Sequence, residues 1–524
     1  MTDDAPAPET TAWPLPAAAD ATARAWLLAG APPGPVPRQA ASVCLLRDAP
    51  EHPGRVEVLW ITRGRSLAVA PGALFVALAG SRVDGHDLVV GCWEAGAVAA
   101  LTARDVPPAP CLPVPDQVTA LGRVARRVVD RAVEGGLQVV GITGSQGKTS
   151  TKDLLAQVLE AVGPTVAPVG NLNNELGVPL TACRLEPETR FLVAELGARG
   201  IGHIAYLCTI TPPHVGVVLN VGQAHVGEFG GQDAITVAKG ELVEALPASG
   251  VAVLNAEDPR VWGMRSRTAA PVLAFAGSGG PPPPEGPALW AEDLRADRLG
   301  RHAFRLHARD ASGATRAADV ALRLTGRHQV PNAVAAAAAA VALGLPLDVV
   351  AAALSAAGPR SRWRMELHER ADGVVVVNDS YNANPDSMRA AVGTLAELGR
   401  SSGGRTVAVL GDMLELGATA EQEHADLGRD VAGAGVDRLL ALGEHAATLA
   451  AGARDAGLPA AAATPVPGKE EALALLRAEL RPGDVVLVKA SRGLALDTVA
   501  EALVAPDAVP GRPDDPSAAS EEPA

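Results

Sequence analysis

A short apolar run followed by a glycine-rich turn and a helix-like segment constrains the fold of this chain more than any other feature. The run Leu137–Val140 is typical of a buried strand, Gly141–Thr151 reads GITGSQGKTST, and Lys152–Val162 has the composition of a helix. In such an arrangement, backbone N–H groups and a helix N-terminus surround a nucleotide phosphate. We therefore predict a nucleotide-binding α/β unit; a purely structural turn is the alternative.

The residues of this loop have distinct expected roles. Lys148 is expected to reach the terminal phosphates, and Thr149 to offer its hydroxyl to Mg²⁺. The loop departs from the common G-x-x-x-x-G-K-[ST] spacing, because Ile142 stands where that pattern has its first glycine. The other expected nucleotide contacts in the loop are Gly144, Ser145, Gly147 and Ser150.

Alternation of apolar strands with helical segments predicts an α/β protein with two larger sheets. Such alternation favours mainly parallel sheets covered by helices, and the second would be a smaller, Rossmann-like one. The strand candidates are Leu137–Ile142, Phe191–Glu195, Val215–Asn220 and Val251–Asn255 within residues 136–358, and Val374–Val377, Thr406–Leu410, Arg438–Leu442 and Val485–Val488 within residues 359–505.

The remaining parts of the chain differ in composition. Residues 41–135 contain short strand-like runs between turn signals, which predict a small α/β domain. Residues 1–40 are rich in Ala and Pro, and residues 506–524 are rich in Pro, Asp and Ser, so both are expected to be poorly ordered. The proline run within Gly277–Pro287 predicts an exposed loop.

Charge and cysteine content exclude several function classes. The net charge is −14 with no basic block, which argues against nucleic acid as the main partner. Five cysteines without a C-x-x-C pair favour a reduced cytosolic compartment and no cysteine-based zinc site. Residues 1–20 hold no Lys or Arg, unlike a secretory signal, and the alanine-rich run Ala333–Leu345 predicts a buried helix rather than a membrane span.

Polar residues follow the predicted strands of the first large sheet. Glu195 ends an apolar strand and is placed to bind Mg²⁺, although a loop acid would look the same. His225 lies in a glycine-rich loop after Asn220, where a packed or solvated histidine is the alternative. Lys239 by itself is typical of a helix surface, and Asn173 and Asn174 are explained equally by a turn.

Three polar clusters follow neighbouring apolar strands in the second sheet. They are Asp379–Ser387, which holds one of the two tyrosines, Gly411–Gly417 and Lys489–Gly493. Because the carboxyl ends of parallel strands meet at one edge, we expect the three clusters to converge there on a ligand.

Together these strings resemble, in order, the branch of the Mur ligase family that adds D-alanyl-D-alanine to UDP-N-acetylmuramoyl-tripeptide. The similarity runs from about Pro71 to about Asp497, and the string Asp379-Ser-Tyr-Asn-Ala-Asn-Pro385 is the most diagnostic. The resemblance implies three domains: a UDP-substrate domain (41–135), a central ATP-binding domain (136–358) and a C-terminal ligase domain (359–505).

The resemblance also implies ATP and two Mg²⁺ sites. Thr149 and Glu195 would hold the first ion, and His225 with a carbamylated Lys239 the second; an unmodified Lys239 paired with an acid is the alternative. Asn332 would lie on the adenine side, Arg364 at the phosphates and Asp379 at the ribose. Lys148, Lys239, His225 and Arg364 would be the catalytic set, and the substrate contacts would be Ser66, Asn173, Asn174, Tyr381, Asn382, Asn384, Lys489, Ser491 and Arg492.

The implied reaction begins with ATP, which converts the tripeptide carboxylate to an acyl phosphate that the dipeptide amine then attacks. Closure of the two larger domains about a hinge near Gly358 would bring ATP and amine together. The resemblance implies a cytoplasmic monomer with no membrane insertion and no nucleic-acid partner.

Two other functions are compatible with the sequence. Arg65-Ser66-Leu67 stands where the family usually has Asp-Ser-Arg, which allows a related ligase with a different carboxylate acceptor. The third hypothesis is a nucleotide-binding scaffold protein without catalytic turnover, although a scaffold has no need of two metal sites.

Overall fold

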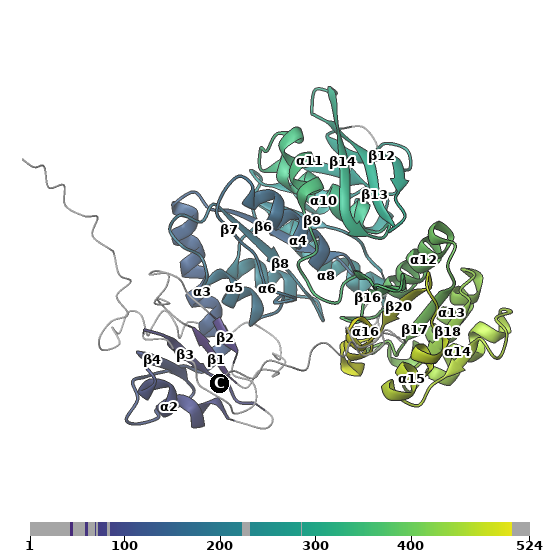
Figure 1. The fold of residues 1–524 in the computed structure, drawn as a ribbon. Helices are drawn as coiled ribbons and strands as arrows, with labels where there is room; N and C mark the ends of the chain where they lie inside the picture. Colours follow the sequence, from purple (N-terminus) through teal and green to yellow (C-terminus); the bar gives the residue numbers. More distant parts are fainter. Residues whose placement is uncertain are drawn as a thin grey trace, which may run out of the picture. The chain divides into compact units, whose positions relative to one another are not determined.

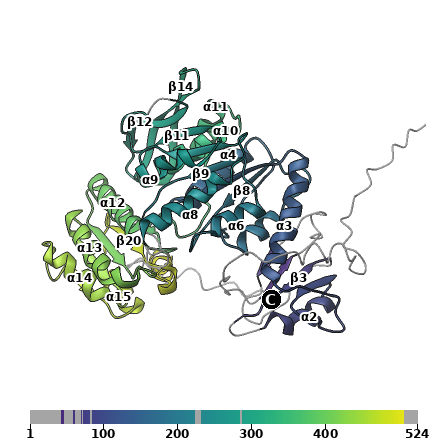
Figure 2. The same cartoon turned by 180° about the vertical axis from the view of Figure 1, so that it is seen from behind.

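The computed structural model describes residues 69, 72–80, 84–222, 231–283 and 286–505, and the backbone of strands 42–45 and 58–60. The expected N-terminal extension, the tail after residue 505, Ser66 and His225 lie outside the described residues. The chain divides into two compact units, one formed by Met1–Arg131 with Ala182–Glu186 and the other by the rest. The described strands form three sheets, which are labelled in Figure 1 and seen from behind in Figure 2.

The first unit holds a five-stranded sheet of order β2-β1-β3-β4-β5. Strand β1 pairs antiparallel with β2 and β3, whereas β3, β4 and β5 run parallel. Its elements are β1 (Ser42–Leu45), β2 (Val58–Trp60), β3 (Leu74–Ala77), η1 (Gly85–Leu88), α2 (Val89–Glu94), β4 (Ala99–Thr102) and β5 (Cys111–Pro113), followed by α3 (Gln117–Glu134).

The central sheet has the order β14-β13-β12-β11-β10-β9-β6-β8-β7. Its strands are β6 (Gln138–Thr143), β7 (Thr165–Val166), β8 (Phe191–Glu195), β9 (Val215–Val218), β10 (Val251–Asn255), β11 (Val272–Ala276), β12 (Ala288–Ala296), β13 (Arg301–Arg309) and β14 (Thr315–Thr325). Its helices are α4 (Lys148–Glu160), α5 (Gly177–Ala182), α6 (His203–Ile210), α8 (Gln232–Glu244), α9 (Pro259–Gly263), η2 (Met264–Arg267), α10 (Gln329–Ala342) and α11 (Leu347–Ala356).

The parallel part of this sheet was predicted, but its antiparallel extension was not. Strands β6 to β12 pair in parallel, whereas β12, β13 and β14 form an antiparallel meander. β13 and β14 alternate buried and exposed residues over part of their length, whereas β12 begins with four buried residues. Alternation of this kind is typical of a sheet with one solvated face, and it lacks the continuous apolar runs that mark the parallel strands.

Two glycines let helix α8 approach the central sheet closely. Gly141 and Gly216 are neighbours on β6 and β9. A Cβ on Gly141 would lie 3.0 Å from the Leu242 Cδ1 atom, and one on Gly216 would lie 3.2 Å from the Leu242 Cγ atom. Such contacts are tighter than ordinary packing, so side chains here would push α8 outward. The close approach matters because α8 carries Lys239.

The third sheet has the order β15-β16-β20-β17-β18-β19. All its pairs are parallel except β15 with β16. Its strands are β15 (Glu366–Glu369), β16 (Val375–Asn378), β17 (Thr406–Leu410), β18 (Arg438–Ala441), β19 (Ala463–Pro465) and β20 (Val485–Lys489), and its helices are α12 (Pro385–Ser402), η3 (Gly417–Thr419), α13 (Ala420–Gly433), α14 (Ala446–Asp455), α15 (Lys469–Glu479), η4 (Arg492–Leu494) and α16 (Asp497–Val504).

Alternate residues of these strands enter two separate cores. Val375 and Val377 pack with α12, α13 and α14, whereas Val374 and Val376 pack with α15 and α16. Because successive side chains of a strand point to opposite faces, a run of valines can feed both layers. The sheet therefore lies between two layers of helices, as a Rossmann-like fold requires (Figure 1).

Several predicted boundaries shift. Helix α4 begins at Lys148 rather than Lys152, because the end of the glycine loop already forms its first turn, and β9 ends at Val218 rather than Asn220. The alanine-rich run lies in α10, which is buried as predicted. Among the described helices, none is both long and apolar enough to cross a membrane.

Candidate nucleotide-binding and ligase site

The glycine loop joins β6 to α4 through a residue in the left-handed region. Gly147 has φ +79° and stands at the N-cap of α4. A Cβ at this position would collide with the Asn332 Oδ1 atom, so α10 approaches the loop at a point where only glycine fits. The same oxygen lies 3.5 Å from the Thr151 hydroxyl, which brings the predicted adenine-side asparagine to the loop.

The loop is tied to the segment that follows β9. The Asn220 side chain accepts a hydrogen bond from the Gln146 N–H (3.0 Å) and donates to the Gln146 carbonyl (3.2 Å). The Ser145 hydroxyl accepts from the Gly222 N–H at 2.9 Å. Its position at a strand end, in a polar and glycine-rich run, predicts that Asn220 belongs to a ligand loop, but its contacts with Gln146 were not predicted.

Lys148 is folded back onto its own loop. Its Nζ donates to the Gly144 carbonyl at 2.7 Å. Burial lowers the pKa of this amine and Arg364 lowers it further, whereas Glu195 acts in the opposite direction. The loop therefore concentrates positive charge next to a carboxylate, as a site for a phosphate and a divalent cation would.

Glu195 has one oxygen engaged and one not. Its carboxylate is 1% exposed, and Oε1 accepts from the Asn173 side-chain amide at 2.8 Å. Oε2 is buried and has no hydrogen-bond partner among the described residues. A buried carboxylate oxygen without a partner is costly, and a bound cation would remove that cost. Asn173 thus orients Glu195, while the neighbouring Asn174 accepts from Leu176 and Gly177 N–H groups at the start of α5.

Lys239 is buried on α8, at 6% exposure. Burial first, and then the charge of Lys148, hold the pKa of its amine well below the usual value. A lysine in that environment loses its proton more readily than the surface lysine that its local sequence suggests. No group of three His, Cys, Asp or Glu side chains with metal-binding geometry occurs within the described ranges.

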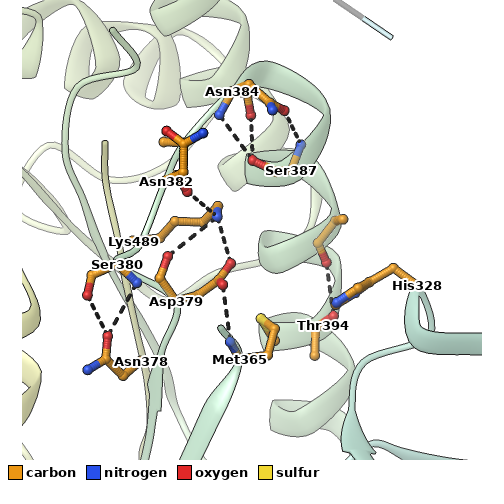
Figure 3. A network of polar contacts seen from close by, with 12 residues as sticks. His328, Met365, Asn378, Asp379, Ser380, Asn382, Asn384, Ser387, Thr394 and Lys489 are labelled. Atoms are coloured by element: carbon orange, nitrogen blue, oxygen red, sulfur yellow. Dashed lines mark hydrogen bonds and ion pairs between the residues drawn. The ribbon is translucent and has the colours of Figure 1, made fainter. Parts of the chain in front are cut away.

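The three polar clusters of the third sheet do converge at one edge, because β16, β20 and β17 are neighbours. Lys489 joins two of them: its Nζ lies 2.6 Å from Asp379 Oδ2 and 2.8 Å from the Asn382 carbonyl (Figure 3). The other oxygen of Asp379 accepts from the Met365 N–H at 3.1 Å. Lys489, predicted to contact substrate, therefore holds the loop that carries Asn382.

The same edge contains a pocket of about 200 Å³. Asn384 lines it and also caps α12, since its side chain accepts from the Ser387 N–H at 2.9 Å and the Ser387 hydroxyl lies 3.0 Å from the Asn384 N–H (Figure 3). Ser491 closes another side by accepting from the Leu414 N–H at 2.9 Å. The nine lining residues are Asn382, Ala383, Asn384, Leu414, Glu415, Leu416, Ser491, Arg492 and Gly493.

Arg364 lies in a strained segment beside the Asp379 loop. Its guanidinium carbon is 4.2 Å from the centre of the Tyr381 ring, and its Nε is buried without a hydrogen-bond partner among the described residues. Trp363 and Met365, on either side, have φ of +60° and +51°. Non-glycine residues adopt such angles only where surrounding contacts enforce them, which is common at ligand sites.

The structure thus brings together most of the predicted residues in two groups. Lys148, Thr149, Glu195, Lys239 and Asn332 surround or adjoin the glycine loop, and Tyr381, Asn382, Asn384, Ser491 and Arg492 surround or adjoin the pocket of the third sheet. Ser66 and His225 belong to neither, because both lie outside the described residues.

Comparison with known families agrees with this geometry. Three family models match the chain: the Mur ligase middle domain over residues 142–340, the Mur ligase glutamate ligase domain over residues 363–492, and the Mur ligase family catalytic domain over residues 63–128.

Individual relatives match over most of their length. The UDP-N-acetylmuramoyl-tripeptide--D-alanyl-D-alanine ligase of Mycobacterium tuberculosis is 45% identical over 84% of this chain and 91% of the relative, and the Escherichia coli ligase of the same name is 36% identical over 83% and 91%. Among solved structures, MurF from Acinetobacter baumannii is 33% identical with a TM-score of 0.73, covering 83% of this chain and 91% of that one. MurF ligase from Thermotoga maritima, in complex with ADP, is 28% identical with a TM-score of 0.69, covering 83% and 94%.

Proposed function

This chain belongs to the Mur ligase family, and we propose that it joins D-alanyl-D-alanine to UDP-N-acetylmuramoyl-tripeptide with ATP, in the synthesis of peptidoglycan precursors. The observation that carries the proposal is the 45% identity, over 84% of the chain, to a ligase of that name. The glycine loop and the polar pocket supply the two sites that such an ATP-dependent ligase needs, one for the nucleotide and one for the incoming amine.

The glycine loop and its neighbours would bind the nucleotide, and the related MurF ligase from Thermotoga maritima was solved in complex with ADP. Backbone N–H groups at the start of α4 would face the phosphates, and Lys148 would exchange its bond to the Gly144 carbonyl for a phosphate oxygen. Arg364 would add a second positive charge, since its guanidinium is near enough to lower the pKa of Lys148. Transfer of the terminal phosphoryl group to the tripeptide carboxylate would create an acyl phosphate for the dipeptide amine to attack.

The residues present fit a divalent cation. The unpartnered Glu195 Oε2 and the buried Thr149 hydroxyl are both hard oxygen donors, the type that Mg²⁺ prefers. When bound, Mg²⁺ would offset negative charge on the phosphoryl oxygens. Asn173 would keep Glu195 in place by binding its other oxygen.

Lys239 fits a carbamate for a physical reason. Only an uncharged amine reacts with CO₂, and burial lowers the pKa of Lys239, which favours the uncharged form. We propose that carbamylated Lys239 and His225 hold a second Mg²⁺. Carbamylation would also replace the repulsion between Lys239 and Lys148 by attraction.

The domain roles are part of the same proposal: residues 41–135 for the UDP end of the acceptor, 136–358 for ATP and 359–505 for the dipeptide. The Gly358 N–H and carbonyl both bond to the Gln157 side chain at 3.0 Å, and Arg360 pairs with Glu160. Since these contacts tie the linker to α4, we place the hinge after Arg360 rather than at Gly358. We further propose that the enzyme acts as a monomer in the cytoplasm.

A different acceptor is not favoured, because relatives that are 36–45% identical over 83–89% of this chain share one name. The residues that raised that alternative, Arg65 to Leu67, lie outside the described residues.

The test is phosphate release by the full chain with ATP, D-alanyl-D-alanine and UDP-N-acetylmuramoyl-tripeptide, with the product identified by mass. Release should require all three and yield the pentapeptide. Glu195→Gln should lose at least about 100-fold in kcat, while Glu188→Gln, an exposed acid in the same region, should match wild type. Phosphate release without a coupled pentapeptide product would refute the proposed acceptor.

A further inference from the structure

The pocket of the third sheet combines both signs of charge with an apolar wall. Of its nine lining residues only Glu415 and Arg492 are charged, and they have opposite signs. Leu414, Leu416 and Ala383 supply apolar surface, and the other lining residues are amides, a hydroxyl and a glycine. A pocket lined by one charge of each sign favours a ligand that is neutral overall but charged at two places, because each charged end then meets an opposite charge.

Arg492 is held in one orientation by two contacts. Its Nη1 donates to Asp497 Oδ1 at 2.6 Å, and its guanidinium carbon lies 4.1 Å from the centre of the Trp363 ring. Asp497 accepts a hydrogen bond from one edge of the Arg492 guanidinium, which has five N–H donors in all, and the Trp363 ring packs against one face of the same group. A guanidinium fixed in this way loses little further conformational freedom when it binds a carboxylate through two parallel hydrogen bonds.

Glu415 is held in an unusual backbone conformation at the pocket. Its φ is +65°, which costs energy for any residue but glycine. The two residues before it are fixed through their N–H groups: Met413 donates to His424 Nε2 at 3.0 Å, and Leu414 donates to the Ser491 hydroxyl at 2.9 Å. His424 is fully buried, burial lowers its pKa, and its Nε2 accepts the bond from Met413. The fold thus maintains a strained turn that places an acid on the pocket wall.

We propose that this pocket binds the dipeptide by both of its charged ends, with Arg492 on the carboxylate and Glu415 on the ammonium group. Leu414, Leu416 and Ala383 contact the small methyl side chains between them. Trp363 and Asp497 are positioning residues, since they act only through Arg492. This inference rests on the proposed function and assigns the part of each residue in choosing the amine substrate.

The test uses three ligands of the full-length enzyme: D-alanyl-D-alanine, its C-terminal amide as alternative substrate, and N-acetyl-D-alanyl-D-alanine as a competitor that cannot react. In wild type, the KM of the amide should exceed that of the dipeptide by about 10- to 100-fold, the usual effect of one bond between charged groups. Arg492→Gln should raise the KM of the dipeptide by a similar factor and abolish the difference between acid and amide. It should also raise the Ki of the N-acetyl competitor, which retains its carboxylate.

Glu415→Gln should behave in the opposite way toward the competitor. It should raise the KM of D-alanyl-D-alanine about 10-fold or more but leave the Ki of the N-acetyl compound unchanged, because that compound has no ammonium group to lose. Arg492→Lys keeps a positive charge and should retain part of the discrimination between acid and amide. Arg400→Gln and Glu421→Gln, exposed residues that do not line the pocket, are the matched controls.

The two proposals fail in different ways. Wild-type turnover of D-alanyl-D-alanine, with Arg492→Gln raising the KM of acid and amide equally, would overturn the assignment of Arg492 and leave the ligase function standing. Equal changes in KM and Ki in Glu415→Gln would overturn the assignment of Glu415. Wild type that ligates a different amine and ignores the dipeptide would overturn the ligase function and this inference together.

Discussion

The ion pair between Lys489 and Asp379 should be among the most costly single contacts to break in the third sheet. The two side chains are 3% and 14% exposed, and their atoms lie 2.6 Å apart. Lys489→Met roughly preserves the length of the side chain but removes one of the two hydrogen-bond donors to the Asp379 carboxylate that the described residues show. The Met365 N–H is the donor that remains. Removing one partner of a buried pair costs about 3–5 kcal/mol, because the other charge stays buried without compensation.

The structure also predicts how this cost divides. Lys489→Met further loses the 2.8 Å bond to the Asn382 carbonyl, worth about 1 kcal/mol. Asp379→Asn in the same background should restore much of the loss, because no uncompensated charge then remains. We expect the double variant to be more stable than the sum of the two single changes by about 2 kcal/mol or more.

The assay is urea unfolding of the full chain, followed by far-UV circular dichroism, for wild type, both single variants and the double variant. Activity provides a second readout: Asn382 lines the dipeptide pocket, so Lys489→Met should raise the KM for D-alanyl-D-alanine more than the KM for ATP. Additive free energies in the double variant, or a loss below about 1 kcal/mol in Lys489→Met, would refute the idea that this pair holds the loop.

Three further outcomes are expected. Lys239→Met should lower kcat by about 100-fold or more. In buffer free of CO₂ and Mg²⁺, where Lys239 is an unmodified amine, its depressed pKa lowers the free energy of unfolding at pH values below the unfolded value of 10.5. Urea unfolding in that buffer should therefore show the Met variant to be more stable than wild type near neutral pH, with the difference closing as pH rises toward 10.5. Burial lowers the pKa of His328 from 6.5 to about 4, so the unfolded chain binds this proton more readily than the folded one. Through this residue the free energy of unfolding should fall by at most about 3 kcal/mol as pH falls from 6.5 to 4. His328→Gln should flatten that part of the curve of stability against pH, and an unchanged curve would contradict the prediction. Gly147→Ala should weaken ATP binding about 10-fold or more in calorimetry, since the new Cβ is strained at φ +79° and meets Asn332, whereas Gly433→Ala, in open space on α13, should bind ATP like wild type.

Local sequence determined the repeating elements and the identity of the chemical groups. Continuous apolar runs such as Phe191–Glu195 and Thr406–Leu410 appear as strands with those bounds, because a strand buried on both faces needs apolar residues throughout. The glycine loop was recognisable because its chemistry lies in consecutive residues. The convergence of three polar clusters in the third sheet also followed, since parallel neighbours end at one edge.

The meander β12–β14 was missed because the alternating pattern of β13 and β14 carries a weaker signal than a long apolar run, and the pairing of β12 with β11 is not visible in a local window. The Asn220 contact to Gln146 was missed because it joins residues 74 positions apart. Neither is encoded in a local window of sequence.

The amino-acid sequence therefore determined which side chains are available for the reaction. The tertiary structure decided the protonation and the hydrogen bonding of each of them. Lys239 is an ordinary lysine in its local sequence, but in the folded chain it is 6% exposed and burial lowers its pKa. Glu195 becomes a candidate cation ligand because Asn173 takes one oxygen and burial isolates the other. The charge of the Lys239 amine and the unpaired oxygen of Glu195 depend on the surrounding dielectric and on partners far away in sequence. Only the folded chain supplies both.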